Sequence, residues 1–170
     1  MRIFQTILYQ YIFGYIIQGF AYSLGIYAFC QQKVELKKYI SVSILLIIIS
    51  IITRTIIMSL MPQIFGIHTI LDLVFLFLLG IFFLKISAFR MFRSILAITV
   101  LLIMTELISV FFLTFILGQA TVDSMMKDSV GAAIIALPSS VLFAILIVSS
   151  YFILIKMKMK KSAINGEGSK

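Results

Sequence analysis

The stretch from Arg54 to Asp72, RTIIMSLMPQIFGIHTILD, joins two long apolar runs and decides the fold. It contains Pro62, Gly66 and the single histidine, His68, and proline and glycine so close together are typical of a turn. Arg54 lies eight residues before Pro62, and Asp72 lies ten residues after it. Because an α-helix rises about 1.5 Å per residue, an antiparallel hairpin brings both charges to a similar depth, roughly 10 Å below one membrane surface.

The composition excludes a water-soluble globule. The chain has 170 residues, of which 62% are hydrophobic and 12% are charged, and its mean hydropathy is +1.20. A soluble domain averages about half apolar and about a quarter charged residues. Long apolar runs instead match the roughly 20 residues that a helix needs to span a bilayer. We therefore predict an all-α protein of the cell membrane, with no second, soluble domain.

The apolar runs and the charges between them predict the topology. Lys and Arg are abundant after the first, third and fifth runs and nearly absent after the second and fourth. The positive-inside rule then places the N-terminus outside and the C-terminus in the cytoplasm. We predict a bundle of five transmembrane helices over residues 1–155, a loop at residues 118–129, and a basic, disordered cytoplasmic tail over residues 156–170. The five runs cover residues 3–29, 39–60, 66–84, 94–117 and 130–155.

Ionisable residues inside the apolar runs are the candidate functional residues, because charges in hydrocarbon are costly and usually face a bundle interior or a partner. The hairpin predicts an ion pair between Arg54 and Asp72. Two roles remain open for this pair. It is either the polar floor of a ligand pocket that opens to the outside near His68, or a structural contact that holds the hairpin together. His68 itself, at a helix start, is either an interfacial residue or a ligand-binding one.

Glu106 lies near the middle of the fourth run. It is either a proton-carrying or ligand-binding carboxylate, or a carboxyl that stays protonated and bonds Thr105, Ser109 or Gln18. Burial in an apolar medium disfavours the charged form of a carboxyl group, which supports the second alternative. Gln18 also permits two interpretations, a cavity lining or part of a helix-packing seam.

Small residues recur at helical spacing in the first and fifth runs, and such faces let helix backbones approach closely in lipid. Pro138 is expected to kink the fifth helix. The tyrosines of the first run, including Tyr22, are typical of the headgroup region. The predicted packing positions are Gly14, Ala21, Gly25, Ala132, Ala136, Ser140 and Ala144.

The sequence shows no catalytic constellation, so we expect no enzyme and no cofactor. Cys30 and His68 fall at opposite ends of their runs, about a membrane thickness or roughly 30 Å apart, so they form no dyad. A single histidine rules out paired-histidine metal spacing, and no metal site is expected. The net charge of +8 clusters at the ends of apolar runs, so the expected partner is the lipid bilayer and not nucleic acid.

Residues 36–80, LKKYISVSILLIIISIITRTIIMSLMPQIFGIHTILDLVFLFLLG, resemble the membrane sensor region of clostridial-type sensor histidine kinases, which are related to the peptide-pheromone receptor kinases. The most specific piece is the turn FGIHTI, and the likeness covers residues 13–117. Such kinases continue into a phospho-accepting histidine and an ATP-binding domain. This chain ends fifteen residues after Ile155, and its only histidine is His68. The resemblance therefore implies a stand-alone sensor domain that acts through a separate partner.

Three functions follow as hypotheses. The first is a non-enzymatic multi-pass membrane protein that serves as a sensor-like or receptor-like signalling module, alone, as a homo-oligomer or with a membrane partner protein. The alternative is a small substrate-binding or accessory subunit of a membrane transporter. The third is a subunit that only supports the assembly of a larger complex. The sequence does not name a ligand.

Overall fold

The computed structural model describes residues 14–60, 67–127 and 129–167, and the secondary structure of these residues is helical, with no strand. The prediction of an all-α protein is confirmed for this part of the chain. The helices are α2 (Ile16–Phe29), α3 (Leu36–Leu60), α4 (Ile67–Phe82), α5 (Ala88–Leu117), α6 (Gln119–Lys127) and α7 (Ser129–Glu167).

Three helices in the described residues are long and apolar enough to cross a membrane, namely α3, α5 and α7, through the segments Leu36–Thr53, Ala88–Leu117 and Ile134–Lys160. Most side chains in these segments face outward, and many are large and apolar, as lipid contact requires. The helices α2 and α4 are also apolar but shorter, with 14 and 16 residues. The chain is therefore a helical membrane protein.

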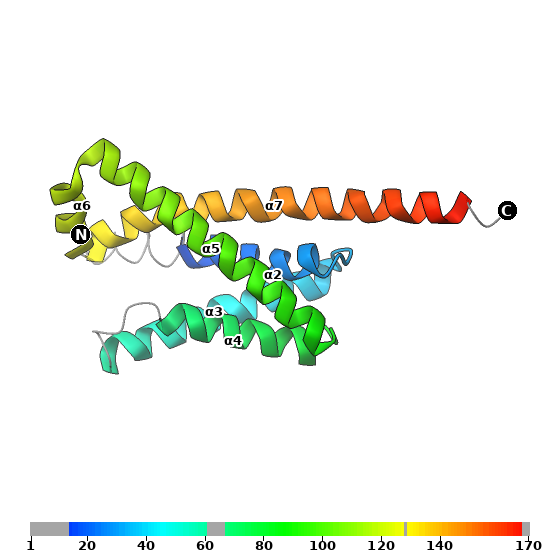
Figure 1. The fold of residues 1–170 in the computed structure, drawn as a ribbon. Coiled ribbons are helices and arrows are strands. Elements are labelled where there is room, and N and C mark those ends of the chain that lie inside the picture. The colour runs from blue at the N-terminus through cyan, green and yellow to red at the C-terminus, as the bar shows by residue number, and fades with distance from the viewer. Residues whose placement is uncertain (1–13, 61–66, 128, 168–170) are drawn as a thin grey trace.

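Helix α2 is the centre of the bundle. It packs against α3, α5 and α7 and also touches α4, and Figure 1 shows it, in blue, between α7 and the α3–α4 pair. A tyrosine in the first apolar run is expected at the headgroups, but the Tyr22 side chain is only 2% exposed and packs edge-on against Phe143 of α7, with 5.3 Å between ring centroids. The expectation is wrong for Tyr22, because neighbouring helices surround α2 where an isolated helix would meet lipid.

Glycines allow this close packing. A side-chain carbon at Gly25 would lie 2.9 Å from Ile98 Cγ1 of α5 and 3.3 Å from Ile147 Cδ1 of α7. At Gly19 it would collide with Ile47 of α3. The small face of α2 is thus a packing seam, on which α5 and α7 meet at Gly25, and Ala21 is buried with it.

Helices α3 and α4 lie side by side (Figure 1), as the hairpin prediction requires. The turn itself, with Pro62 and Gly66, lies outside the described residues. The hydroxyl of Thr53 donates to Asp72 Oδ1 over 3.5 Å, so positions 53 and 72 lie at the same level. This register agrees with the depth inferred for Arg54 and Asp72, although the side chain of Arg54 is not among those described.

The segment predicted as a loop at residues 118–129 contains the nine-residue helix α6 instead. Gly118 separates α5 from α6 with a φ of 80°, a conformation in which glycine avoids the steric penalty of a side chain. Asp123 also accepts a hydrogen bond from Gln119 Nε2 one turn earlier, over 3.0 Å. The polar composition of this segment suggested a loop, but the i, i+4 pair fits a short helix equally well.

Helix α7 differs most from the sequence prediction. It runs without interruption for 39 residues through Pro138 and continues to Glu167, across most of the tail predicted as disordered. Lys, Met and Ala are good helix formers, and they extend a helix that the apolar segment has already nucleated. At about 1.5 Å per residue α7 is roughly 58 Å long, about twice a hydrocarbon core, and Figure 1 shows its C-terminal end extending well beyond the other helices.

Candidate functional site

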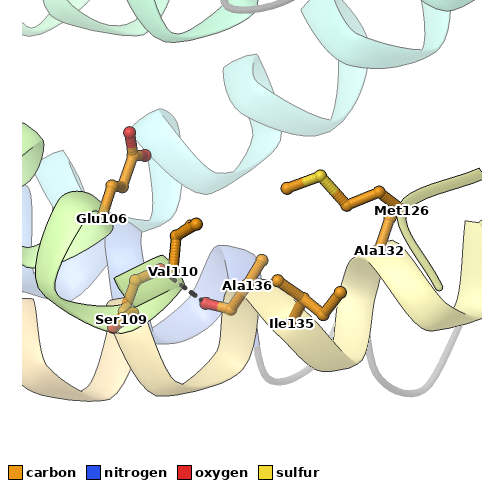
Figure 2. Close-up of a pocket in the computed structure, with 8 residues that line it drawn as sticks. Glu106, Ser109, Val110, Met126, Ala132, Ile135 and Ala136 are labelled. Carbon is orange, nitrogen blue, oxygen red and sulfur yellow. Dashed lines mark hydrogen bonds between the residues drawn. The ribbon is translucent and has the colours of Figure 1, made fainter. Parts of the chain in front are cut away.

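A cavity of about 360 Å³ lies between α5, α6 and α7. Figure 2 shows Glu106 reaching from α5 at one side and Met126 from α6 at the other, with residues of α7 between them. The volume falls in the range of small-molecule sites. The lining residues are Glu106, Ser109, Val110, Met126, Ala132, Ile135, Ala136 and Ser139.

Glu106 is the one ionisable side chain in this lining. It lies eleven residues before the end of α5, or roughly 16 Å along the helix axis. Its side chain is exposed, and within the described residues it forms no hydrogen bond or ion pair. The bonds to Thr105, Ser109 or Gln18 that one sequence interpretation requires are not formed there. The carboxyl group is thus available to a molecule in the cavity.

Ser109 lies one turn after Glu106 and is 3% exposed. Its Oγ is buried and has no hydrogen-bond partner among the described residues. Serines inside helices usually donate to a carbonyl of the preceding turn, as Ser140 does to the Ala136 carbonyl. A buried hydroxyl without a partner costs free energy, so Ser109 is a second polar group that a bound molecule can satisfy.

The small-residue ridge of α7 has two roles. Ser140 is 4% exposed, and Ala144 packs against the buried core, so this half of the ridge lies in the bundle as predicted. Ala132 and Ala136 instead line the cavity, and Ala136 is exposed. The expectation that Ala136 sits in a tight helix contact is therefore wrong, because α5 and α6 stand away from α7 at this level.

The polar cluster predicted from the sequence is only partly described. Asp72 is 5% exposed, and both Asp72 and Glu106 act electrostatically on the hydroxyl of Tyr22. The side chains of Arg54 and His68 lie outside the described residues. Gln18 and Gly14 are half-buried in the first turns of the described chain.

The end of the bundle opposite α6 holds a second set of polar contacts. Cys30 Sγ and Ser94 Oγ are 3.0 Å apart. Burial raises the pKa of the Cys30 thiol, while the hydrogen bond with Ser94 and the nearby charges of Arg90 and Arg93 act against this rise. The thiol therefore stays protonated at neutral pH. Within the described residues no group of three or more His, Cys, Asp or Glu side chains is placed to hold a metal ion.

Helix α7 is joined to the α2–α3 loop at this same end. Lys158 Nζ donates to the Gln31 carbonyl over 2.9 Å, and Val34 N donates to the Tyr151 hydroxyl over 3.3 Å. Gln31 adopts a φ of 52° just after α2, which turns the chain toward α7. These two bonds connect the long helix to the basic loop that contains Lys33.

Sequence reasoning selected Glu106 but missed the cavity around it. Met126 and Ile135 carry no signal in the sequence that distinguishes a cavity lining from ordinary apolar packing. Because residues 118–129 were predicted as a loop, no wall formed by α6 was expected. Comparisons with known proteins add nothing to this picture, since no family model, no curated protein and no solved structure matches the chain.

Proposed function

We propose that the chain is a non-enzymatic, receptor-like signalling module of the cell membrane. It binds a small ligand in the cavity between α5, α6 and α7 and passes the binding event to the cytoplasm through α7. The observation that carries this proposal is the continuity of α7, since one 39-residue helix holds both the cavity wall and the basic C-terminal extension. The resemblance to the membrane region of sensor kinases favours the same function.

The contacts of α7 suggest how the event is transmitted. Ala132 and Ala136 form the cavity wall near the start of the helix, and Tyr151 and Lys158 hold the α2–α3 loop near its other end. Because α7 is continuous between these two sets of contacts, we expect a ligand that displaces its first turns to displace the contacts at its other end as well. A ligand shifts this equilibrium only as far as its affinities for the two arrangements differ.

The proposed topology keeps five spans, including the shorter helices α2 and α4, with the cavity in the outer half. The α2–α3 loop, the start of α5 and the extension of α7 meet at one end of the bundle. Together with the adjoining first turn of α3, these three segments carry most of the Lys and Arg residues. Basic residues gathered at one end agree with a cytoplasmic location for that end.

Cysteine labelling tests this orientation. Single cysteines replace Gln63, Gln119 and Lys158 in a Cys30→Ser background, and intact cells are treated with a membrane-impermeant maleimide. We expect labelling at position 119 and at Gln63, which lies outside the described residues, and no labelling at position 158 until the cells are opened. The reverse pattern would show that the N-terminus is cytoplasmic.

A cavity-filling variant tests the coupling through α7. In the same background, cysteines at Gln31 and Lys158 form a disulfide whose rate reports the contact between the loop and the extension. Ala136→Phe fills the cavity without a ligand, and we expect it to change this rate several-fold. Leu142→Phe adds a ring at an exposed position of the same helix and should leave the rate unchanged. Equal rates in both variants would contradict transmission through α7.

Transport remains the second candidate, because a substrate-binding subunit would use the same cavity. Uptake of a substrate that depends on a separate ATPase would favour transport. A change in the activity of a membrane partner, without uptake, would favour the receptor.

A further inference from the structure

The proposed function leaves the chemistry of the ligand open, but the lining of the cavity is specific. Two of its polar groups, Glu106 and Ser109, lie one helical turn apart on α5, while the Ser139 hydroxyl on α7 already donates to the Ala136 carbonyl over 2.8 Å. The facing wall of α7 is mostly apolar and small, through Ala132, Ile135 and Ala136. The cavity therefore has one acidic, hydrogen-bonding side and one apolar side.

We propose that this cavity binds an ammonium group on an apolar body, with the Glu106 carboxylate and the Ser109 hydroxyl oxygen both accepting hydrogen bonds from the ammonium. This inference deepens the proposed function and uses the same cavity. An ammonium has three donors and no acceptor, which matches a carboxylate and a hydroxyl that lack partners among the described residues.

The match to a cation is stronger than the match to a neutral ligand. A hydrogen bond between two ionised groups is roughly twice as strong as a neutral one. The apolar side chains of the cavity lining reduce the competition of water for this bond. An anionic ligand would meet repulsion from the Glu106 carboxylate, and no basic side chain lines the cavity to offset it. A purely apolar ligand would leave the Ser109 hydroxyl unsatisfied.

Two sources can supply this chemistry. A free amine can enter the cavity from outside, and the headgroup of phosphatidylethanolamine carries the same ammonium group. The depth of Glu106 along α5, roughly 16 Å from the helix end, favours the free amine. The experiment below separates the two sources by lipid composition.

The test uses a matched pair of photoreactive probes on the full chain in nanodiscs. One probe is a benzylamine with a trifluoromethyl-diazirine on its ring, and the other is the corresponding benzyl alcohol, which has a similar shape and no charge. We expect saturable labelling of residues 132–139 by the amine, with an affinity about tenfold or more above that of the alcohol, or about 1.4 kcal/mol. Equal labelling by both probes would overturn the inference.

Variants assign the effect to the cavity. Glu106→Gln keeps the shape of the side chain and should lower the affinity for the amine about tenfold while leaving alcohol labelling unchanged. Ser109→Ala should lower it several-fold. Asp123→Asn removes an exposed carboxylate on α6, outside the cavity lining, and should have no effect. If Glu106→Gln binds the amine as well as the unaltered chain does, the carboxylate is not the receptor for the ammonium and the inference is wrong.

Two further measurements identify the source of the ammonium group and test whether its binding changes the contact between α7 and the α2–α3 loop. Nanodiscs of phosphatidylcholine and phosphatidylglycerol are compared with nanodiscs that also contain phosphatidylethanolamine. Loss of amine labelling in the second set identifies the lipid headgroup as the ligand, and unchanged labelling identifies a free amine. The crosslinking rate between positions 31 and 158 is measured with the amine probe present. Amine binding without a change in this rate would refute the proposed function while leaving the assigned ligand chemistry intact.

Discussion

Replacement of Gly25 by leucine is expected to destabilise the folded bundle by about 1–3 kcal/mol or more, the cost typical of overpacking a filled core. Gly25 lies where α5 and α7 both meet α2. Even a single added carbon would approach Ile98 to 2.9 Å and Ile147 to 3.3 Å. A leucine side chain has no space there unless the helices separate. Because α2 contacts most of the other helices, their separation affects the whole bundle.

A graded series checks this expectation. Gly25→Ala should cost less, because alanine gains up to about 1 kcal/mol of helix propensity over glycine. Ser149→Leu places the same side chain on an exposed position of α7 and serves as the control. The measurement is the temperature at which the purified protein loses monodispersity in detergent. If the Gly25→Leu and Ser149→Leu variants lose monodispersity at the same temperature, the seam between α2, α5 and α7 is not closely packed.

The features that the sequence predicted well depend on local pattern. Apolar runs of sufficient length predict helices in a membrane, because unsatisfied backbone groups are too costly in lipid for other structures. The turn residues and the two flanking charges predicted the α3–α4 hairpin, and the Thr53–Asp72 contact agrees with its register. Small residues at Ala21 and Gly25 predicted a seam, and Gly25 lies where side chains of α5 and α7 approach α2.

The features that the sequence did not predict depend on how the helices assemble. By its position in the sequence, Tyr22 resembles an interfacial tyrosine. In the structure three helices pack around α2, and the Tyr22 side chain is buried between them. Ala136 resembles Ser140 in spacing, but only Ser140 lies in a close contact, because α6 and α5 hold the space around Ala136 open. Glu106 was recognised as a candidate from its charge alone. Ser109 and Val110 share its face of α5, but the remaining lining residues come from α6 and α7, and no spacing rule along the chain connects those residues to Glu106.

The environment of Asp72 likewise depends on how the helices assemble. The structure describes its burial, but the side chain of Arg54 lies outside the described residues. Asp72 is 5% exposed inside an apolar helix. The Thr53 hydroxyl has one proton, and it lies 3.2 Å from the Ser50 carbonyl and 3.5 Å from Asp72 Oδ1. Desolvation of a carboxylate at such a site costs several kcal/mol even after relaxation, and a cation nearby lowers this cost. Arg54, next to Thr53 in the chain, is the cation that the register of the hairpin predicts beside Asp72.

Asp72→Leu and Arg54→Leu are each expected to lower stability by about 3–5 kcal/mol, because each strands an uncompensated charge among apolar side chains. The double variant removes both charges and should recover much of this loss, since a buried ion pair need not be net stabilising relative to apolar residues of similar volume. Folded yield and the temperature of aggregation in detergent are measured for the two single variants, the double variant and the unaltered chain. Thr53→Ala is the control for the hydrogen bond alone and should cost about 1 kcal/mol or less. If the two single losses simply add in the double variant, positions 54 and 72 are not coupled, and Glu106 becomes the candidate partner for Arg54.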